Sequence, residues 1–368
     1  MLLLLEQLVN IDSGTSNKEG IDKVGGILQS EYTKLGFIVE IIPQVSQGNH
    51  LMIRHVNAIA PEIIVVAHMD TVFKKGTAEA RPFSIRGDRA YGPGVIDMKA
   101  SHVTLLFAVK ALIEKGIGGP ENTLILLTSD EETGSATSRQ LIEDLAEDKK
   151  YALIMEPARQ DGSLVTARRG AGEYVLRVKG VASHAGIAPE AGRSAIEELA
   201  RKISKLHKLT DHSAGISVNV GLIEGGNTVN TVAPSATAHV DLRISRMEQA
   251  TWLEQQVEDI CATPDVEGTS IELVGGIDRP PMVKNEQTIR LLEVIQEAGN
   301  ELGIVIRDTA TGGGSDASFT SAIGVATIDG LGPIGGYAHT EDEYLEVPSL
   351  VERTELLANV IQRLTERK

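Results

Sequence analysis

The stretch Ile63-Ile64-Val65-Val66-Ala67-His68-Met69-Asp70 joins an unbroken apolar run to a histidine and an acid that follow it directly. A continuous run of mostly β-branched residues is typical of a strand that is buried on both faces of a sheet. Such strands are common in α/β proteins, whose sites lie at the carboxyl ends of the strands. The stretch therefore predicts an α/β domain in which His68 and Asp70 lie at the rim of the sheet.

Other acids and another histidine occupy similar positions along the chain. They follow apolar runs or lie in glycine-rich loops, and they are Asp97, Glu131, Glu132, Glu156 and His339. Histidine and carboxylate ligands without a thiolate are typical of a catalytic zinc ion or a similar divalent cation. Each residue taken alone could be structural, but the shared type of position predicts a metal-dependent hydrolase.

Two of these positions have specific alternatives. Asp97 ends a loop with two glycines and a proline, where a carboxylate can bridge two cations about 3.5–4 Å apart, but it could equally cap the following helix. Placing the adjacent carboxylates of Glu131 and Glu132 at the end of a strand costs free energy unless a cation or a proton compensates their charge. In an extended backbone one can face a metal ion and the other the water that it activates. The alternative for this pair is a solvated acidic helix start.

The first half of the chain alternates between apolar strands and amphipathic helices, which predicts a three-layer α/β/α domain. The expected strands are 37–43, 50–56, 62–67, 123–128 and 151–155, and the expected helices are 2–10, 17–35, 99–115 and one after Gly134. The pattern resumes after Pro280-Pro281 with helices at 285–302 and 348–366. We therefore expect residues 1–166 and 282–368 to form one catalytic domain.

The middle of the chain has a different pattern. Strands are expected at 172–180, 216–223, 235–244 and 269–274, and helices at 193–206 and 246–261. The strands alternate apolar and polar residues, as half-exposed antiparallel strands do. The order β-α-β-β-α-β is the split βαβ arrangement. Residues 167–281 are therefore expected to form an inserted α+β domain.

Composition and charge argue against several classes of protein. The 368 residues are 42% hydrophobic and carry a net charge of −16 without a basic block, so no nucleic-acid partner is expected. No apolar run is long enough to cross a bilayer, so no membrane partner is expected. The single cysteine, Cys261, allows no internal disulfide, and its surroundings are typical of an ordinary helix rather than of a nucleophile. These features predict a cytoplasmic location.

Seven segments together resemble the co-catalytic zinc exopeptidase family. They are HMDTV (68–72), YGPGVIDMKAS (91–101), SDEETGS (129–135), MEP (155–157), SHAGIAPEAGRSAI (183–196), TGGGSDAS (311–318) and AHTEDE (338–343). The family includes glutamate carboxypeptidase, aminoacylase, acetylornithine deacetylase, succinyl-diaminopimelate desuccinylase and peptidase T. The segments follow the family's order over nearly the whole chain, and they are most similar to glutamate carboxypeptidase of the folate-cleaving type.

The resemblance implies two zinc ions per subunit and a ligand set for each. One ion would be held by His68 and Glu156, and the other by Glu132 and His339. Asp97 would bridge the two ions. Cobalt or manganese could take the place of zinc, because nitrogen and oxygen sites accept several divalent ions.

The resemblance also implies residues for catalysis and substrate binding. Glu131 would be the general base, Asp70 would orient His68, and the Asp97–Met98 peptide bond would be cis. The inserted domain would be a lid and dimerisation domain, whose His184 reaches the active site of the partner in a homodimer. The substrate's carboxylate would be held by Asn230, Arg279, Gly312, Gly313, Gly314 and Arg243, although Arg243 could equally form a strand-surface ion pair.

The expected activity is hydrolysis of the amide bond to a C-terminal amino acid, of the glutamate carboxypeptidase type. A peptide or an N-acyl amino acid would be the substrate. A deacylase or an aminotripeptidase of the same family is the alternative. An alternative of another class is a dimeric binding protein that keeps the fold without catalysis.

Overall fold

The computed structural model describes residues 1–367, which form two compact units. Unit 1 comprises Met1–Ala167, Lys284–Thr311 and the chain from Ser315 onward. Unit 2 comprises Arg168–Val283 together with Gly312–Gly314. The sequence predicted the insertion at 167–281, but it did not predict that the glycine segment belongs to the second unit.

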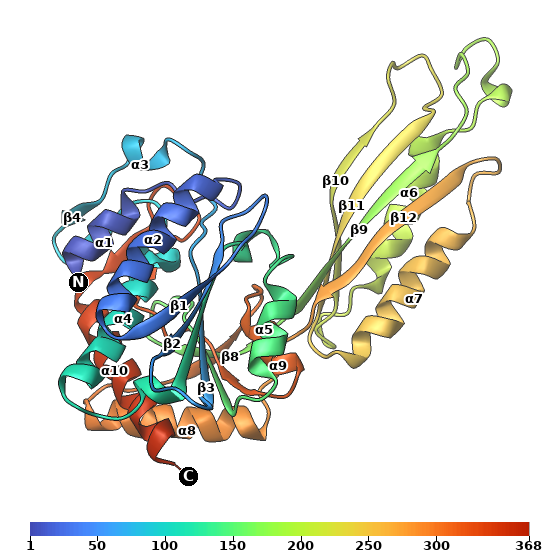
Figure 1. Cartoon of the computed structure of the whole chain (residues 1–368). Helices are drawn as coiled ribbons and strands as arrows, with labels where there is room; N and C mark the ends of the chain where they lie inside the picture. The colour runs from blue at the N-terminus through green and yellow to red at the C-terminus, as the bar shows by residue number, and fades with distance from the viewer. Residues whose placement is uncertain (368) are drawn as a thin grey trace. The chain divides into compact units, whose positions relative to one another are not determined.

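Unit 1 is built on a six-stranded sheet with the order β1-β2-β6-β3-β7-β14. Strands β3, β6, β7 and β14 run parallel, whereas β1 and β2 form an antiparallel edge. Figure 1 shows helices α2, α4 and α10 on one face of this sheet and α5 and α9 on the other. The predicted three-layer α/β/α architecture is confirmed. The strands are β1 (Phe37–Ile42), β2 (His50–His55), β3 (Ile63–His68), β6 (Thr123–Thr128), β7 (Tyr151–Ile154) and β14 (Ala326–Ile328), and the helices are α1 (Leu2–Val9), α2 (Lys18–Lys34), α3 (Thr77–Ala80), α4 (Ala100–Glu114), α5 (Arg139–Ala146), α8 (Glu286–Glu301), α9 (Ala317–Ala322) and α10 (Val347–Glu366).

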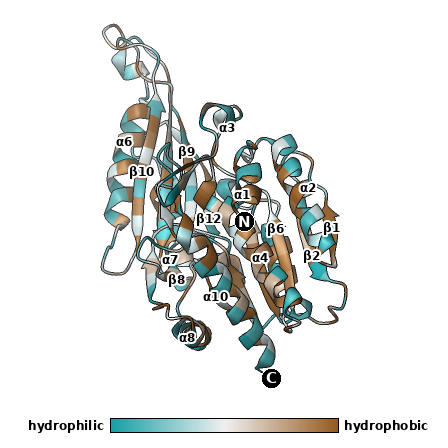
Figure 2. Ribbon diagram, turned by 90° about the vertical axis from the view of Figure 1, so that its left-hand side faces the viewer, coloured by the Kyte–Doolittle hydropathy of each residue, from teal (hydrophilic) through white to brown (hydrophobic). Residues whose placement is uncertain are grey.

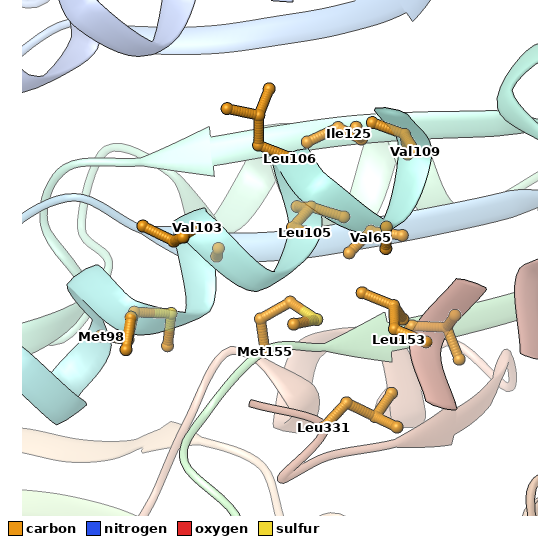
Figure 3. Close-up of a cluster of buried hydrophobic side chains, with 14 of the residues drawn as sticks. Val65, Met98, Val103, Leu105, Leu106, Val109, Ile125, Leu153, Met155 and Leu331 are labelled. Atoms are coloured by element: carbon orange, nitrogen blue, oxygen red, sulfur yellow. The ribbon is translucent and has the colours of Figure 1, made fainter. Parts of the chain in front are cut away.

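The central strands are apolar because helices cover both of their faces. Every residue of β3 and of β6 is buried. Helix α4 places Val103, Leu105 and Leu106 in the same hydrophobic cluster as Val65 of β3 and Ile125 of β6 (Figure 3). The outer helices differ from these strands. Figure 2 shows both hydrophobic and hydrophilic residues on α2 and α10, as expected for helices that lie between a core and water.

A second, smaller sheet in unit 1 was not predicted. It has the order β15-β16-β5-β4, and none of its strands is longer than three residues: β4 (Ser84–Arg86), β5 (Arg89–Tyr91), β15 (Gly335–Gly336) and β16 (Tyr344–Glu346). Strands this short carry no readable alternation. The pair β8 (Leu164–Arg168) and β13 (Asp308–Thr311) was missed as well. The small sheet joins segments that lie about 250 residues apart in the sequence, since Tyr344 pairs with Tyr91.

Unit 2 is a four-stranded antiparallel sheet with the order β10-β11-β9-β12 and two helices. In β11, Ala238, Val240 and Leu242 are fully buried and alternate with partly exposed residues, so one face packs on the helices and the other faces water. The predicted split βαβ arrangement is confirmed. The elements are β9 (Gly170–Lys179), α6 (Ala195–Leu206), β10 (Ser217–Gly225), β11 (Ser235–Ile244), α7 (Glu248–Ala262) and β12 (Ser270–Arg279).

Strand β12 continues to Arg279, beyond its predicted end at residue 274, through Gly275 and Gly276. Glycines usually end a strand prediction, but here the antiparallel pairing with β9 continues across them. Gly275 has φ of 130°, and a Cβ at this position would lie 1.9 Å from the carbonyl oxygen of Glu173. Only glycine allows this close approach of the two strands.

Two neighbouring acids on α6 allow a test of what holds unit 2 together. Glu198 and Lys202 are fully buried and 3.3 Å apart, and Glu198 also accepts hydrogen bonds from the backbone N–H groups of Asp265 and Val266. Glu198→Ala removes a carboxylate partner of the buried Lys202 and leaves both N–H groups without their acceptor. We therefore expect the free energy of unfolding of unit 2 to fall by about 3 kcal/mol.

Glu197→Ala is the matched control, because Glu197 is exposed and pairs with the exposed Arg201 on the same helix. Breaking an exposed pair of this kind is expected to cost less than about 0.5 kcal/mol. Urea denaturation followed by circular dichroism measures both variants. Equal losses in the two would contradict the role given to the buried pair.

Candidate metal centre

The parallel strands bring the first site residues together. His68 is the last residue of β3 and pairs with Thr128 at the end of β6, while β7 lies on the other side of β3. Glu131 and Glu132 follow β6, and Glu156 follows β7. Because β3 lies between these two strands, His68 receives carboxylates from both sides. This is the arrangement that the strand-end pattern in the sequence predicted.

The candidate ligands form two overlapping groups around His68. Potential ligand atoms lie within 4.8 Å of one another in the group His68, Glu131 and Glu156, and likewise in the group His68, Asp97 and Glu132. His68 Nε2 lies 3.2 Å from Asp97 Oδ1 and 3.7 Å from Glu156 Oε1. Glu131, expected as the base, is thus also within reach of a ligand position.

Asp97 lies between two histidines. His68 Nε2 is 3.2 Å from its Oδ1 atom, and His339 Nε2 is 3.2 Å from its Oδ2 atom. His339 Nε2 is also 3.2 Å from Glu132 Oε2. One carboxylate that presents a different oxygen to each histidine has the geometry needed to bridge two cations. The Asp97–Met98 peptide bond is cis, as the family resemblance implied.

The charges of the cluster favour cations. Burial raises the pKa of Glu156 well above its usual value, and the nearby charge of Asp97 raises it further. Burial also raises the pKa of Glu132, whereas hydrogen bonds to Asp97 and Glu132 raise the pKa of His339 to about 10. Burial of Glu132 and Glu156 and the carboxylates beside His339 both favour added positive charge, so the cluster gains free energy by binding cations.

Unpaired oxygen atoms support the same conclusion. Within residues 1–367, Glu132 Oε1 is buried without a hydrogen-bond donor, and Asp97 Oδ1 makes no hydrogen bond although His68 Nε2 lies 3.2 Å away. A buried carboxylate oxygen without a donor is costly unless a cation reaches it. The residues present therefore fit a pair of divalent cations with nitrogen and oxygen ligands.

Asp70 has a wider role than the sequence indicated. The backbone carbonyl oxygen of Asp70 lies 2.9 Å from His68 Nδ1, whereas its carboxylate is 3.5 Å from that nitrogen. The carboxylate accepts hydrogen bonds from Thr15 Oγ1 at 2.6 Å and from the backbone N–H groups of Glu131 and Glu132 at 3.2 Å. Asp70 therefore holds both the histidine of β3 and the acidic turn after β6. Thr15 had no signal in the sequence that could have identified it.

A second buried acid, Glu343, also escaped the sequence analysis. It lies in the quoted AHTEDE segment, but only His339 was singled out there. Its carboxylate accepts hydrogen bonds from the backbone N–H groups of Gly94, Ile96 and Asp97. Nothing local distinguishes this acid from its exposed neighbours Glu341 and Asp342.

The other predicted residues lie in unit 2, where they form two groups. His184 and Asn230 come from adjacent segments, because His184 forms a β-bridge with Thr231 and the N–H of Ala185 donates to the carbonyl oxygen of Asn230. Both side chains belong to exposed residues.

The second group surrounds the glycine segment. Arg279 is buried so closely against Gly314 that a Cβ there would lie 2.6 Å from Arg279 Cδ. Arg168, which the sequence analysis missed, donates to the carbonyl oxygens of Gly313 and Gly314 at 3.1 Å each. Arg243 of β11 lies opposite Ala171 of β9, as Arg279 of β12 does from the other side, and it pairs with Asp241 at 2.8 Å, the strand-surface ion pair that was its alternative.

Comparison with known proteins agrees with this geometry. Residues 64–363 match the model of peptidase family M20/M25/M40. The chain is similar to carboxypeptidase G2 from Pseudomonas sp. (strain RS-16), with 31% identity over 98% of this chain and 88% of the relative. It is 27% identical to succinyl-diaminopimelate desuccinylase from Dechloromonas aromatica, over 92% of each chain. Among solved structures, a tripeptidase from Staphylococcus aureus superposes with a TM-score of 0.82 at 23% identity, over 100% of this chain and 98% of the other.

The fold and the cluster of histidines and acids define a metal-dependent peptidase or amidohydrolase. The family match covers most of the chain, and the chain belongs to peptidase family M20/M25/M40. Within residues 1–367, the structure contains no helix with the length and apolar character of a membrane span.

Asp70→Ala tests whether this residue organises the centre. Loss of its carboxylate leaves the N–H groups of Glu131 and Glu132 without an acceptor and loosens the turn that carries them. Groups that orient ligands in this way typically contribute about 10–100-fold to metal affinity, and we expect a loss in that range. Metal content after dialysis against a graded chelator series measures it. Undiminished binding would show that the turn keeps its geometry without Asp70.

Proposed function

We propose that the protein is a di-zinc metallopeptidase that hydrolyses the amide bond to a C-terminal amino acid, most simply as a glutamate-type carboxypeptidase. The observation that carries the proposal is the position of Asp97, which presents one oxygen to His68 and the other to His339 at 3.2 Å each. The similarity to carboxypeptidase G2 supports the choice of a carboxypeptidase.

In this proposal each cation has its own ligands and shares Asp97. His68 and Glu156 would hold one ion, and Glu132 and His339 the other. When bound, two divalent cations lower the pKa of water and polarise the scissile carbonyl, which allows hydrolysis near neutral pH. Cobalt or manganese would serve at the same ligands.

The chain's own groups would then move the proton. Glu131 would accept a proton from the attacking water and deliver it to the leaving amine. This role requires a carboxylate that lies beside the cations without both of its oxygens binding them. Its backbone N–H is fixed by Asp70 at 3.2 Å, so the start of this turn is well defined.

His184 would stabilise the oxyanion from the partner subunit of a homodimer. Its Nδ1 atom accepts a hydrogen bond from the N–H of Gly186 at 3.1 Å, which places the proton of a neutral ring on Nε2. An exposed Nε2–H group is a suitable oxyanion donor. Strand β10 supports a dimer, because it is an edge of its sheet and exposes Leu222 and Ile223 (51% and 60%).

Arg279, Asn230 and the glycine segment Gly312–Gly314 would hold the substrate's C-terminal carboxylate. The guanidinium of Arg279 suits this role because its planar fork pairs with both oxygens of a carboxylate. Arg168 supports the site indirectly, since it holds the carbonyl groups of Gly313 and Gly314. Arg243 pairs with Asp241 at 2.8 Å, which favours its alternative role as a strand-surface ion pair.

A deacylase or an aminotripeptidase is the second candidate. The desuccinylase relative and the tripeptidase structure favour it, because both are similar to this chain over more than nine-tenths of its length. Folate-type substrates, N-acyl amino acids and tripeptides, offered to the zinc-loaded protein, separate these activities. A non-catalytic dimeric binding protein would hydrolyse none of them.

A cytoplasmic location stays a prediction.

Glu131→Gln tests the proposed base. The amide cannot accept a proton, so we expect turnover to fall by about 10²–10⁴-fold while both metal ions stay bound. Glu132→Gln is the matched neighbour and should lose metal instead. Elemental analysis and turnover of the best panel substrate measure the pair. Loss of a metal ion from the Glu131 variant would assign Glu131 to the ligand set that includes His68 and Glu156.

Subunit complementation tests the role of His184. His184→Ala and Glu131→Gln should each be inactive, but a mixed dimer should contain one complete site, because the Glu131 variant supplies its His184 to the partner. Random pairing would restore up to about a quarter of wild-type activity. A mixture of Glu131→Gln and Glu132→Gln is the control and should stay inactive. No recovery in the first mixture would show that His184 does not act across a dimer.

A further inference from the structure

Glu343 is a buried acid that the proposed mechanism does not use. It precedes β16 and is only 1% exposed. Its Oε2 atom accepts a hydrogen bond from the N–H of Gly94 at 2.9 Å, and its Oε1 atom accepts from the N–H groups of Ile96 and Asp97 at 2.9 and 3.1 Å. One carboxylate thus binds three backbone donors of the loop that ends in Asp97. Charge-assisted bonds of this kind are among the stronger ones in proteins.

The loop needs such a partner because its backbone is irregular. Gly92 and Gly94 have φ of 144° and 70°, and Asp97 has φ of −115° and ψ of 93°, outside helical geometry. N–H groups in a buried irregular segment must find acceptors, and helix α4 begins only at Ala100. Without Glu343, the N–H of Asp97 would lose the acceptor that fixes the orientation of this residue.

Glu343 also connects the Asp97 loop to the segment that carries His339. Both His339 and Glu343 lie between β15 and β16, and the pairing of Tyr344 with Tyr91 places the start of β16 beside the end of β5, where the Asp97 loop begins. The two loops meet again where His339 Nε2 lies 3.2 Å from Asp97 Oδ2. The loops are therefore held at two points, the acid–backbone contact and the ligand contact.

We propose that Glu343 is a positioning residue that sets the separation of Asp97 and His339 and thereby the affinity for the second cation. The inference rests on the proposed two-cation function and extends it to a residue that touches neither cation. Its carboxylate acts through the backbone: it fixes the peptide N–H groups of Ile96 and Asp97, and this fixes the direction of the Asp97 side chain.

Glu343→Gln is the informative variant, because it keeps the shape and one acceptor oxygen but turns an NH₂ group toward at least one backbone N–H. Zinc affinity, measured by competition with a chromogenic chelator, is expected to fall about 10–100-fold for one of the two ions. The rise in melting temperature on adding zinc should shrink accordingly. Glu343→Asp, which keeps the charge on a shorter side chain, serves if the glutamine variant does not fold.

Two controls separate positioning from general destabilisation. Glu198→Gln alters another fully buried acid that binds backbone N–H groups, but in unit 2. It should lower the melting temperature of the zinc-free protein and leave zinc affinity unchanged. Glu341→Gln alters an exposed acid in the same segment as Glu343 and should change neither quantity.

The outcomes are distinct. Wild-type zinc affinity in the Glu343 variants, or a loss no larger than that in Glu198→Gln, would overturn the positioning role. A selective loss of one ion would support it. The number of divalent ions bound by the wild-type protein is measured before any variant is compared. If it is fewer than two, the proposed two-cation function fails.

Discussion

The concentration of carboxylates at one buried end of the sheet is the constraint on which the rest of the structure depends. Asp97, Glu131, Glu132 and Glu156 converge on His68, and burying such charge without compensation costs several kcal/mol per group. The surrounding acids are compensated by hydrogen bonds, as in Asp70 with its Thr15 and turn N–H partners. Within residues 1–367, Glu132 Oε1 and Asp97 Oδ1 are buried without a hydrogen bond, and these two oxygens are suited to cations.

The scaffold provides the precision that such a centre requires. Three parallel strands deliver His68, the acidic turn and Glu156 side by side, and helices on both faces of the sheet hold these strands in a close-packed core. The remaining candidate ligands come from loops, which are less precise unless other groups hold them. The small sheet β15-β16-β5-β4 holds both loops, and Glu343 adds its bonds where the loop backbone is irregular.

Unit 2 carries a different kind of chemistry. Its candidate residues are a histidine whose Nδ1 atom accepts a backbone hydrogen bond and an arginine packed against a glycine segment that is distant in sequence. In the proposed function these groups recognise an oxyanion and a carboxylate, whereas the candidate histidine and acid ligands of unit 1 bind cations. Carboxypeptidase and desuccinylase names both occur among relatives that are similar to this chain over more than nine-tenths of its length.

The sequence by itself determined the two architectures and most of the candidate metal centre. Apolar strands followed by histidine or acid favour a site at the rim of a parallel sheet, and the family resemblance then singled out His68, Glu132 and Glu156 as candidate ligands. Only the tertiary structure identified Thr15 and Glu343 and attached Gly312–Gly314 to unit 2. Their roles depend on contacts with backbone groups from distant segments, as for Glu343 and the loop at Gly94. Such contacts leave no periodic signal in the sequence, because any exposed glutamate would look the same until folding buries it.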